Sequence, residues 1–226
     1  MRGHTHQEFE AELRRLKDRL LAMGGRCEQM MSSAVRAFED RDEALAREVM
    51  AMDRAMDEDE VVVDDLAVRI LALRQPVGRD LRFSVAAVKA STDLERIGDE
   101  AVNIAERAIE MEREGGLSKP AEKLPEMAQR AAAMLRDALN AFVDEDANKA
   151  REVFTQDDAV DDLYGDAMRL CLDYMKDPSR IGDGMRICNC AKYIERIADH
   201  ATNIAELVIF MVEGRDVRHG MGQAQD

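Results

Sequence analysis

The sequence predicts an all-α protein made of two tandem three-helix bundles, related by an internal repeat and built from long antiparallel helices. Three observations support this: a helix-favouring composition, a few helix-breaking stretches, and a segment that returns 100 residues later. Aromatic residues make up 4% of the 226 residues and tryptophan is absent, whereas Ala, Leu, Met, Glu and Arg are frequent. Because these frequent side chains lose little freedom in a helix, helix is expected throughout.

Helix-breaking stretches divide the chain into six expected helices. The breaks fall at 40–42, 75–78, 115–120, 144–146, 177–178 and 214. We therefore expect helices near 8–39, 42–74, 79–114, 121–143, 146–176 and 178–213. On this basis the expected organisation is a first three-helix repeat at 1–114, a linker at 115–120, a second three-helix repeat at 121–213 and a C-terminal tail at 214–226. Because the turns at 40–42 and 144–146 are short, the first two helices of each half should form an antiparallel hairpin.

The internal repeat fixes the expected architecture. Residues 95–106 read ERIGDEAVNIAE and residues 195–206 read ERIADHATNIAE, so nine of twelve positions are identical. A second block, AREV at 46–49, returns at 150–153 with an offset of 104. Two copies of one helical unit imply a molecule with a pseudo-twofold axis, in which the two bundles pack side by side.

The charge balance excludes one class of partner. The net charge of −15 argues against nucleic acid, because phosphate backbones attract a basic surface. Solubility is the commonest reason for such an excess of acids. No apolar run approaches the ~20 residues that a membrane-spanning helix needs, and the N-terminus lacks the apolar core of a secretory signal. We expect a cytoplasmic protein without a transmembrane segment.

Acidic residues of the repeat form ladders on helix faces. Glu95 and Asp99 are four residues apart, which places them one turn apart on one face of a helix, and Glu195 and Asp199 repeat this spacing. One such pair carries little weight, since 47 acids in 226 positions give (47/226)² × 222, about ten, by chance. What gives these pairs weight is that they recur in register.

A second acidic set recurs on the preceding helix of each half. Several carboxylates on adjacent helices form an all-oxygen site suited to hard cations such as iron, Mn, Mg or Ca, and zinc is less expected. The candidate metal ligands are Asp53, Asp57, Glu95 and Asp99 in the first half and Asp157, Asp161, Glu195 and Asp199 in the second. Further candidates, as ligands or supporting groups, are Asn103, Glu106, Asn203 and Glu206. An interhelical ion-pair network with Arg96 and Arg196 remains the alternative. His200 is expected to be a polar surface residue.

These segments resemble the PhoU family of phosphate-transport regulators. The resemblance is carried by LRQPVGRDLR at 73–82, by STDLERIGD at 91–99 running into NIAE at 103–106, and by YIERIADHATNIAE at 193–206. It covers about residues 8 to 213. There are two departures: Ala198 stands where the first repeat has Gly98, and the second half lacks the Arg-Gln-Pro turn. The two metal sites therefore need not be equal.

The resemblance implies a function as well as a fold. It implies carboxylate-rich metal clusters on the repeated motifs, carried over to Glu95, Asp99, Glu195 and Asp199; the assignment of the aspartates on the preceding helices rests on the repeat alone. It also implies a negative regulator of phosphate uptake and starvation signalling, which links the ATPase component of the phosphate ABC transporter to a sensor histidine kinase. Membrane association would be peripheral, through these partners. We expect a homodimer or a weak higher oligomer.

Two other functions are alternatives to regulation. A carboxylate-bridged di-metal oxidoreductase on a helical bundle would use Glu-x-x-His motifs, and the sequence contains none. No nucleophile with a base and no Gly-rich phosphate loop is visible, so an enzyme is not expected. A helical scaffold without metal is the third alternative, and the metal content of the purified protein would separate it from the first.

Overall fold

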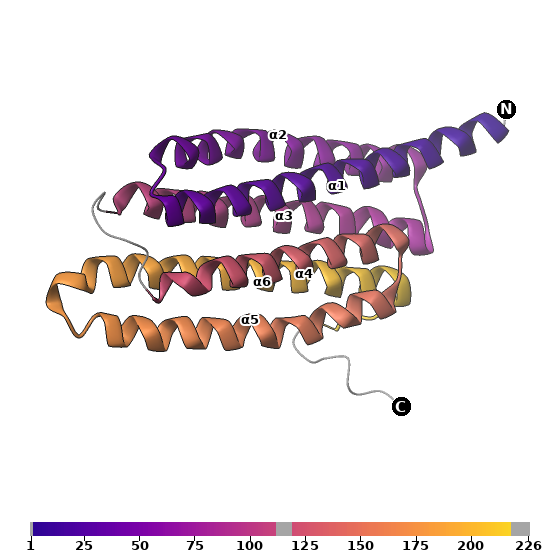
Figure 1. The fold of residues 1–226 in the computed structure, drawn as a ribbon. Coiled ribbons are helices and arrows are strands. Elements are labelled where there is room, and N and C mark those ends of the chain that lie inside the picture. Colours follow the sequence, from indigo (N-terminus) through magenta and orange to yellow (C-terminus); the bar gives the residue numbers. More distant parts are fainter. Residues whose placement is uncertain (1, 112–118, 218–226) are drawn as a thin grey trace.

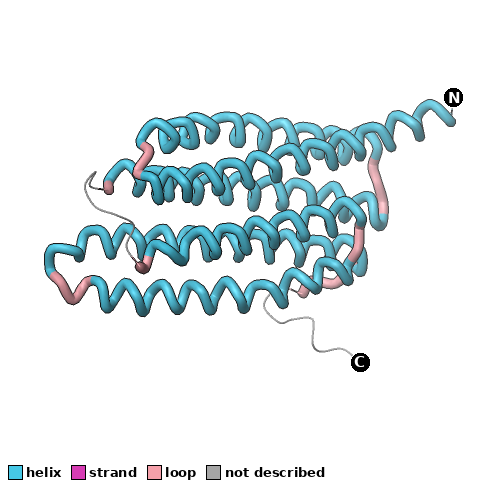
Figure 2. Tube along the Cα trace, viewed as in Figure 1, coloured by secondary structure: helices cyan, strands magenta, loops and turns pink. Residues whose placement is uncertain are grey.

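Long α-helices joined by short turns make up the described part of the chain, residues 2–111 and 119–217 of the computed structural model (Figure 1). The helices are α1 (Arg2–Asp40), α2 (Glu43–Arg74), α3 (Gly78–Glu110), α4 (Leu124–Asp144), α5 (Ala147–Tyr174) and α6 (Ile181–Glu213). Single 3₁₀ turns, η1 (Ala121–Lys123) and η2 (Pro178–Arg180), precede α4 and α6. Figure 2 shows helices and connecting loops, with no strand in the described residues.

The turns inside the two hairpins are built alike. Asp42 begins α2 and accepts a hydrogen bond from the backbone N–H of Leu45, while Asp146 begins α5 and caps two N–H groups. Each cap satisfies donors that the first helical turn leaves unpaired. The residue before each cap, Arg41 or Glu145, has a left-handed backbone with φ of 54° or 55°. The repeat therefore extends to the geometry of its turns.

Several helix boundaries differ from the sequence-based expectation: α4 starts at Leu124 instead of residue 121, after η1, and α5 ends at Tyr174 instead of residue 176. Helix α1 starts at Arg2 instead of residue 8, and α3 ends at Glu110 instead of residue 114, because Met111 adopts an extended backbone. The remaining expected turn of α3 lies outside the described residues. The last helix, α6, starts at Ile181 because Pro178 opens a separate 3₁₀ turn, which the side chain of Asp177 caps.

Two three-helix bundles lie side by side, as expected. Helices α1–α3 pack together, as do α4–α6, and the bundles meet where α3 packs on α6 and α1 packs on α4 (Figure 1). Helices α3 and α6, which carry the repeated motif, thus lie at the centre of the molecule. Helices α2 and α5 lie on its outer sides. Each acid-bearing pair, α2 with α3 and α5 with α6, consists of neighbouring helices.

The core repeats in the same way as the motif. Phe38 and Phe142, which are 104 residues apart, are both almost fully buried, and so are Ile97 and Ile197. Methionine and alanine side chains fill much of the remaining interior. The apolar faces of α3 and α6 point into these cores, which leaves their acidic faces at the edge, beside α2 and α5.

Candidate metal centres

The first candidate centre lies between α2 and α3. We call Asp53, Asp57, Glu60, Glu95 and Asp99 the first cluster. Burial, followed by the charges of the other four residues, raises the pKa of Glu95 to about 7. Burial, Asp57 and Asp99 likewise raise the pKa of Asp53. The carboxylates of the two helices are therefore close enough for their charges to act on one another.

The second candidate centre lies between α5 and α6. We call Asp157, Asp161, Glu195 and Asp199 the second cluster. Burial raises the pKa of Asp157 to about 6, together with the charges of Asp161 and Asp199. The pKa values of Glu195 and Asp199 are also raised, by burial first and then by neighbouring acids. All eight acids predicted from the repeat are therefore brought together, four in each half.

The donor set of both clusters fits a hard cation. Every acid in them offers oxygen ligands, and like charges held together at a half-buried position are stabilised by a positive ion. In the first cluster, Oδ1 of Asp53 is buried and has no hydrogen-bond partner within the described residues. Such an oxygen is available to a cation. As the side chains stand, no group of three or more His, Cys, Asp or Glu residues in the described ranges is arranged to hold a metal ion.

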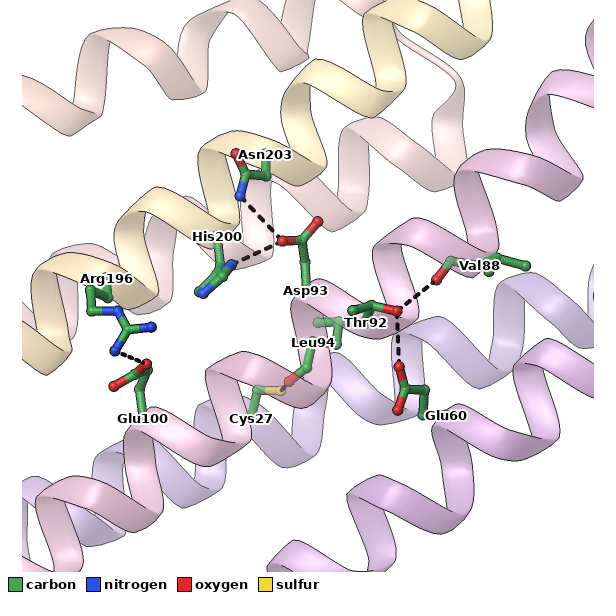
Figure 3. A network of polar contacts seen from close by, with 10 residues as sticks. All are labelled: Cys27, Glu60, Val88, Thr92, Asp93, Leu94, Glu100, Arg196, His200 and Asn203. Carbon is green, nitrogen blue, oxygen red and sulfur yellow. Dashed lines mark hydrogen bonds and ion pairs between the residues drawn. The ribbon is translucent and has the colours of Figure 1, made fainter. Parts of the chain in front are cut away.

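The structure adds Glu60 to the first cluster, a residue that lies outside the repeated acidic pairs. Its charge raises the pKa of Glu95, and its Oε1 accepts a hydrogen bond of 2.9 Å from the hydroxyl of Thr92 (Figure 3). In the second repeat, Tyr164 is the residue equivalent to Glu60, and Lys192 is the residue equivalent to Thr92. A comparison of the two halves at the 104-residue offset would have exposed this difference.

These substitutions make the two clusters unequal. The first cluster holds five carboxylates, whereas the second holds four and has Tyr164 and Lys192 beside Glu195. The positive charge of Lys192 opposes the rise in the pKa of Glu195. The difference between Gly98 in the first repeat and Ala198 in the second has a smaller effect on the clusters. A Cβ added at Gly98 would lie 3.3 Å from Cγ of Met56. Charge, rather than the glycine, thus distinguishes the two halves.

The four further candidates point elsewhere. The amide of Asn103 donates to Glu100 at 3.2 Å and the amide of Asn203 donates to Asp93 at 3.2 Å, both at the contact between α3 and α6. Glu106 forms an ion pair with Arg107. Glu206 lines a small cavity near the end of α6. The structure does not bring these residues to the clusters.

A polar network joins the two repeats between α3 and α6 (Figure 3). Arg196 lies 2.7 Å from Glu100, and Nδ1 of His200 lies 2.9 Å from Oδ1 of Asp93. The expectation for His200 was wrong: it is 7% exposed, because packing of α6 on α3 covers this face of the helix. The alternative of an interhelical ion pair holds for Arg196, whereas Arg96 has no acidic partner among the described residues.

No helix in residues 2–111 or 119–217 is both long and apolar enough to cross a bilayer.

Comparison with known proteins identifies the family. The family model of the PhoU domain matches residues 20–108 and again residues 124–208. The chain is 42% identical over 217 residues to a phosphate-specific transport system accessory protein PhoU homolog from Pseudomonas putida, covering 96% of this chain and 85% of the relative. It is 35% identical over 225 residues to PhoU from Escherichia coli, covering 99% of this chain and 92% of the relative.

Solved structures agree with this. The crystal structure of PhoU from Pseudomonas aeruginosa superimposes with a TM-score of 0.86 at 41% identity, covering 92% of this chain and 100% of that chain. The phosphate transport system regulatory protein PhoU from Streptococcus pneumoniae also gives a TM-score of 0.86, at 29% identity, with 92% and 99% covered. The two PhoU domain matches coincide with the two helical bundles. The chain belongs to the PhoU family.

Proposed function

We propose that this protein is a negative regulator of phosphate uptake and of phosphate-starvation signalling. It would act as a metal-binding adaptor between the ATPase component of the high-affinity phosphate ABC transporter and its sensor histidine kinase. Relatives named accessory proteins of the phosphate-specific transport system support the regulatory role. Their names describe no enzyme, and binding rather than catalysis is the proposed mode of action.

The observation that carries the metal part of this proposal is the pair of open acid clusters, one in each bundle. Asp53, Asp57, Glu60, Glu95 and Asp99 would hold a cation in the first cluster, and Asp157, Asp161, Glu195 and Asp199 in the second. Iron, Mn, Mg and Ca all suit oxygen ligands. A bound cation supplies positive charge that offsets the repulsion between carboxylates. Because the ligands of each site come from two helices, a bound cation would hold α2 against α3 in the first bundle and α5 against α6 in the second.

Partner binding is proposed to occur in the cytoplasm, with membrane association only through the transporter and the kinase. We also propose a homodimer. Exposed apolar side chains of α2 support self-association: Val61, Val68 and Leu73 are 59%, 61% and 66% exposed. Light scattering should give twice the mass of one chain, and a monomer at all working concentrations would remove the dimer from the proposal.

The experiment that tests the regulatory role removes the repeated acids. A variant with Ala at Glu95, Asp99, Glu195 and Asp199 should lose bound metal, stay folded and partly relieve repression of phosphate-starvation genes. Retained folding is expected because removing acids also removes repulsion between like charges. Metal content, circular dichroism and a reporter of starvation genes are the three measurements.

A matched control removes four exposed acids from the outer helices α2 and α5. Replacement of Glu48, Asp65, Glu152 and Asp162 by Ala changes the net charge equally and leaves both clusters intact. This control should retain metal and repress fully. If the cluster variant were folded, metal-free and still repressing, the clusters would have no part in regulation. If both variants lost repression, overall charge would be the cause.

A further inference from the structure

The repeat symmetry is broken at the centre of the molecule. Arg96 of α3 and Arg196 of α6 occupy equivalent positions, and Arg196 pairs with the buried carboxylate of Glu100. The residue equivalent to Glu100 is His200, which cannot neutralise an arginine and instead contacts Asp93 (Figure 3). Arg96 consequently has no carboxylate within ion-pair distance among the described residues, although the chain carries 15 excess negative charges.

A cavity of about 310 Å³ opens beside this arginine, between α3 and α6. Its polar lining comes mainly from Lys89, Thr92, Asp93 and Arg96 of α3 and from Asn203 of α6. Lys89 lies two helical turns before Arg96, which places both cations on one side of α3. Lys89 is exposed and, like Arg96, has no ion-pair partner in the part of the chain that the structure describes.

The carboxylate in the cavity does not cancel these cations. Oδ1 of Asp93 already accepts a hydrogen bond from the amide of Asn203 and contacts Nδ1 of His200. Both groups belong to α6, so Asp93 is held toward that helix (Figure 3). Among the residues that line this cavity, two cations therefore stand beside one engaged carboxylate, and Lys89 also lines a second, smaller cavity with Glu206 and Asp216. The hydroxyl of Thr92 lies within hydrogen-bond distance of two acceptors, Oε1 of Glu60 at 2.9 Å and the backbone carbonyl of Val88 at 3.3 Å (Figure 3).

We propose that this cavity binds a small phosphate-bearing anion between Arg96 and Lys89. A guanidinium offers a planar pair of N–H donors that matches two oxygens of one phosphate group, and an ammonium adds a point charge. The cavity is larger than one inorganic phosphate needs and lies at the lower end of small-molecule sites, so a phosphate monoester also fits.

This site is separate from the metal clusters proposed above. They lie between α2 and α3 and between α5 and α6, whereas the cavity lies between α3 and α6. Binding is therefore measured on the full chain after removal of metal with a chelator, so that phosphate cannot report on a bound cation. Failure of one proposal then leaves the other standing.

The test is a titration with inorganic phosphate, and separately with glycerol 3-phosphate, at constant ionic strength set with chloride. Amide resonances of residues around Arg96 and Asn203 should shift, with an affinity of about the millimolar range expected for two charge-assisted contacts. The variant with Lys89→Gln and Arg96→Gln should bind about tenfold more weakly or worse. Whichever probe binds more tightly distinguishes free phosphate from an ester.

The matched control is Arg15→Gln with Arg69→Gln, which removes two positive charges from exposed positions outside the cavity. It should bind phosphate as the unchanged protein does. Equal weakening in both double variants would show attraction by overall charge and overturn the proposal, as would resonances unmoved by phosphate. An equal response to acetate would overturn the phosphate class. The circular dichroism spectrum of the cavity variant should match that of the unchanged protein, because neither Lys89 nor Arg96 forms an ion pair within the described residues.

Discussion

Arg196 of α6 donates to Glu100 of α3 across the boundary between the repeats, with Nη1 2.7 Å from Oε1. The side chain of Glu100 is 4% exposed and that of Arg196 is 47% exposed. Burial raises the pKa of Glu100, and the charge of Arg196 acts in the opposite direction. The arginine therefore compensates a carboxylate that the packing of α3 on α6 has withdrawn from water.

Removal of this arginine should destabilise the contact between the repeats. The Arg196→Ala variant leaves Glu100 buried with the amide of Asn103 as its remaining donor, which should cost about 1–3 kcal/mol. Its control is Arg96→Ala at the equivalent position of α3, which breaks no ion pair among the described residues and should change stability by less than about 0.5 kcal/mol. Urea unfolding measures both. Equal losses of stability in the two variants would show that the aliphatic part of Arg196 stabilises the protein, and not its ion pair with Glu100.

Contacts within each repeat could be predicted from the sequence. Asp53 and Glu95 lie on helices joined by a short turn, so periodicity alone places their faces side by side. Contacts between the repeats could not. Asp93 and His200 are 107 residues apart, and no local pattern reports which face of α6 packs on α3. His200 was for that reason expected at the surface, where its neighbour Asp199 does lie.

The metal-free protein should become more stable as the pH falls from about 8 toward 5. Glu95 has a folded pKa of about 7 against its usual 4.5, and that of Asp157 is about 6 against 3.8. A raised folded pKa means that the folded state takes up protons before the unfolded chain does. Stability is thus gained as pH falls through the folded pKa, and the gain is complete near the unfolded value.

Glu95→Gln provides the control for this pH dependence. The variant should be more stable than the unchanged protein at pH 8 and should show a shallower change between pH 8 and 5. Urea midpoints in the presence of a chelator give both quantities. Below about pH 4 the trend should reverse, since Glu12 and Asp177 have lowered pKa values and lose favourable contacts on protonation. A rise in stability with pH between 5 and 7 would contradict the assignment of Glu95.

The first cluster should bind a divalent cation more tightly than the second. It has one more carboxylate and no neighbouring lysine, and each carboxylate lost from an oxygen site lowers its affinity. In a manganese titration, the variant Glu95→Ala with Asp99→Ala should lose the tighter sites. Glu195→Ala with Asp199→Ala should lose the weaker ones. Identical curves for the two double variants would show equal centres.

Substitutions at the equivalent positions Glu60 and Tyr164 should reduce the difference in manganese affinity between the two clusters. Glu60→Gln keeps the size of the side chain and its contact with Thr92 while removing one charge. The pKa of Glu95 should fall, because the charge of Glu60 raises it, and the affinity of the first cluster for manganese should fall as well. A merely structural role for Glu60 would move neither quantity in this combination.

Tyr164→Glu should do the opposite in the second half, since it adds a carboxylate beside Glu195 and so raises both its pKa and the affinity for manganese. NMR titration of the glutamate side chains and calorimetry with manganese measure the two effects independently. If Glu60→Gln lowered the pKa of Glu95 yet left manganese binding unchanged, Glu60 would be a neighbour of the first cluster and not one of its ligands.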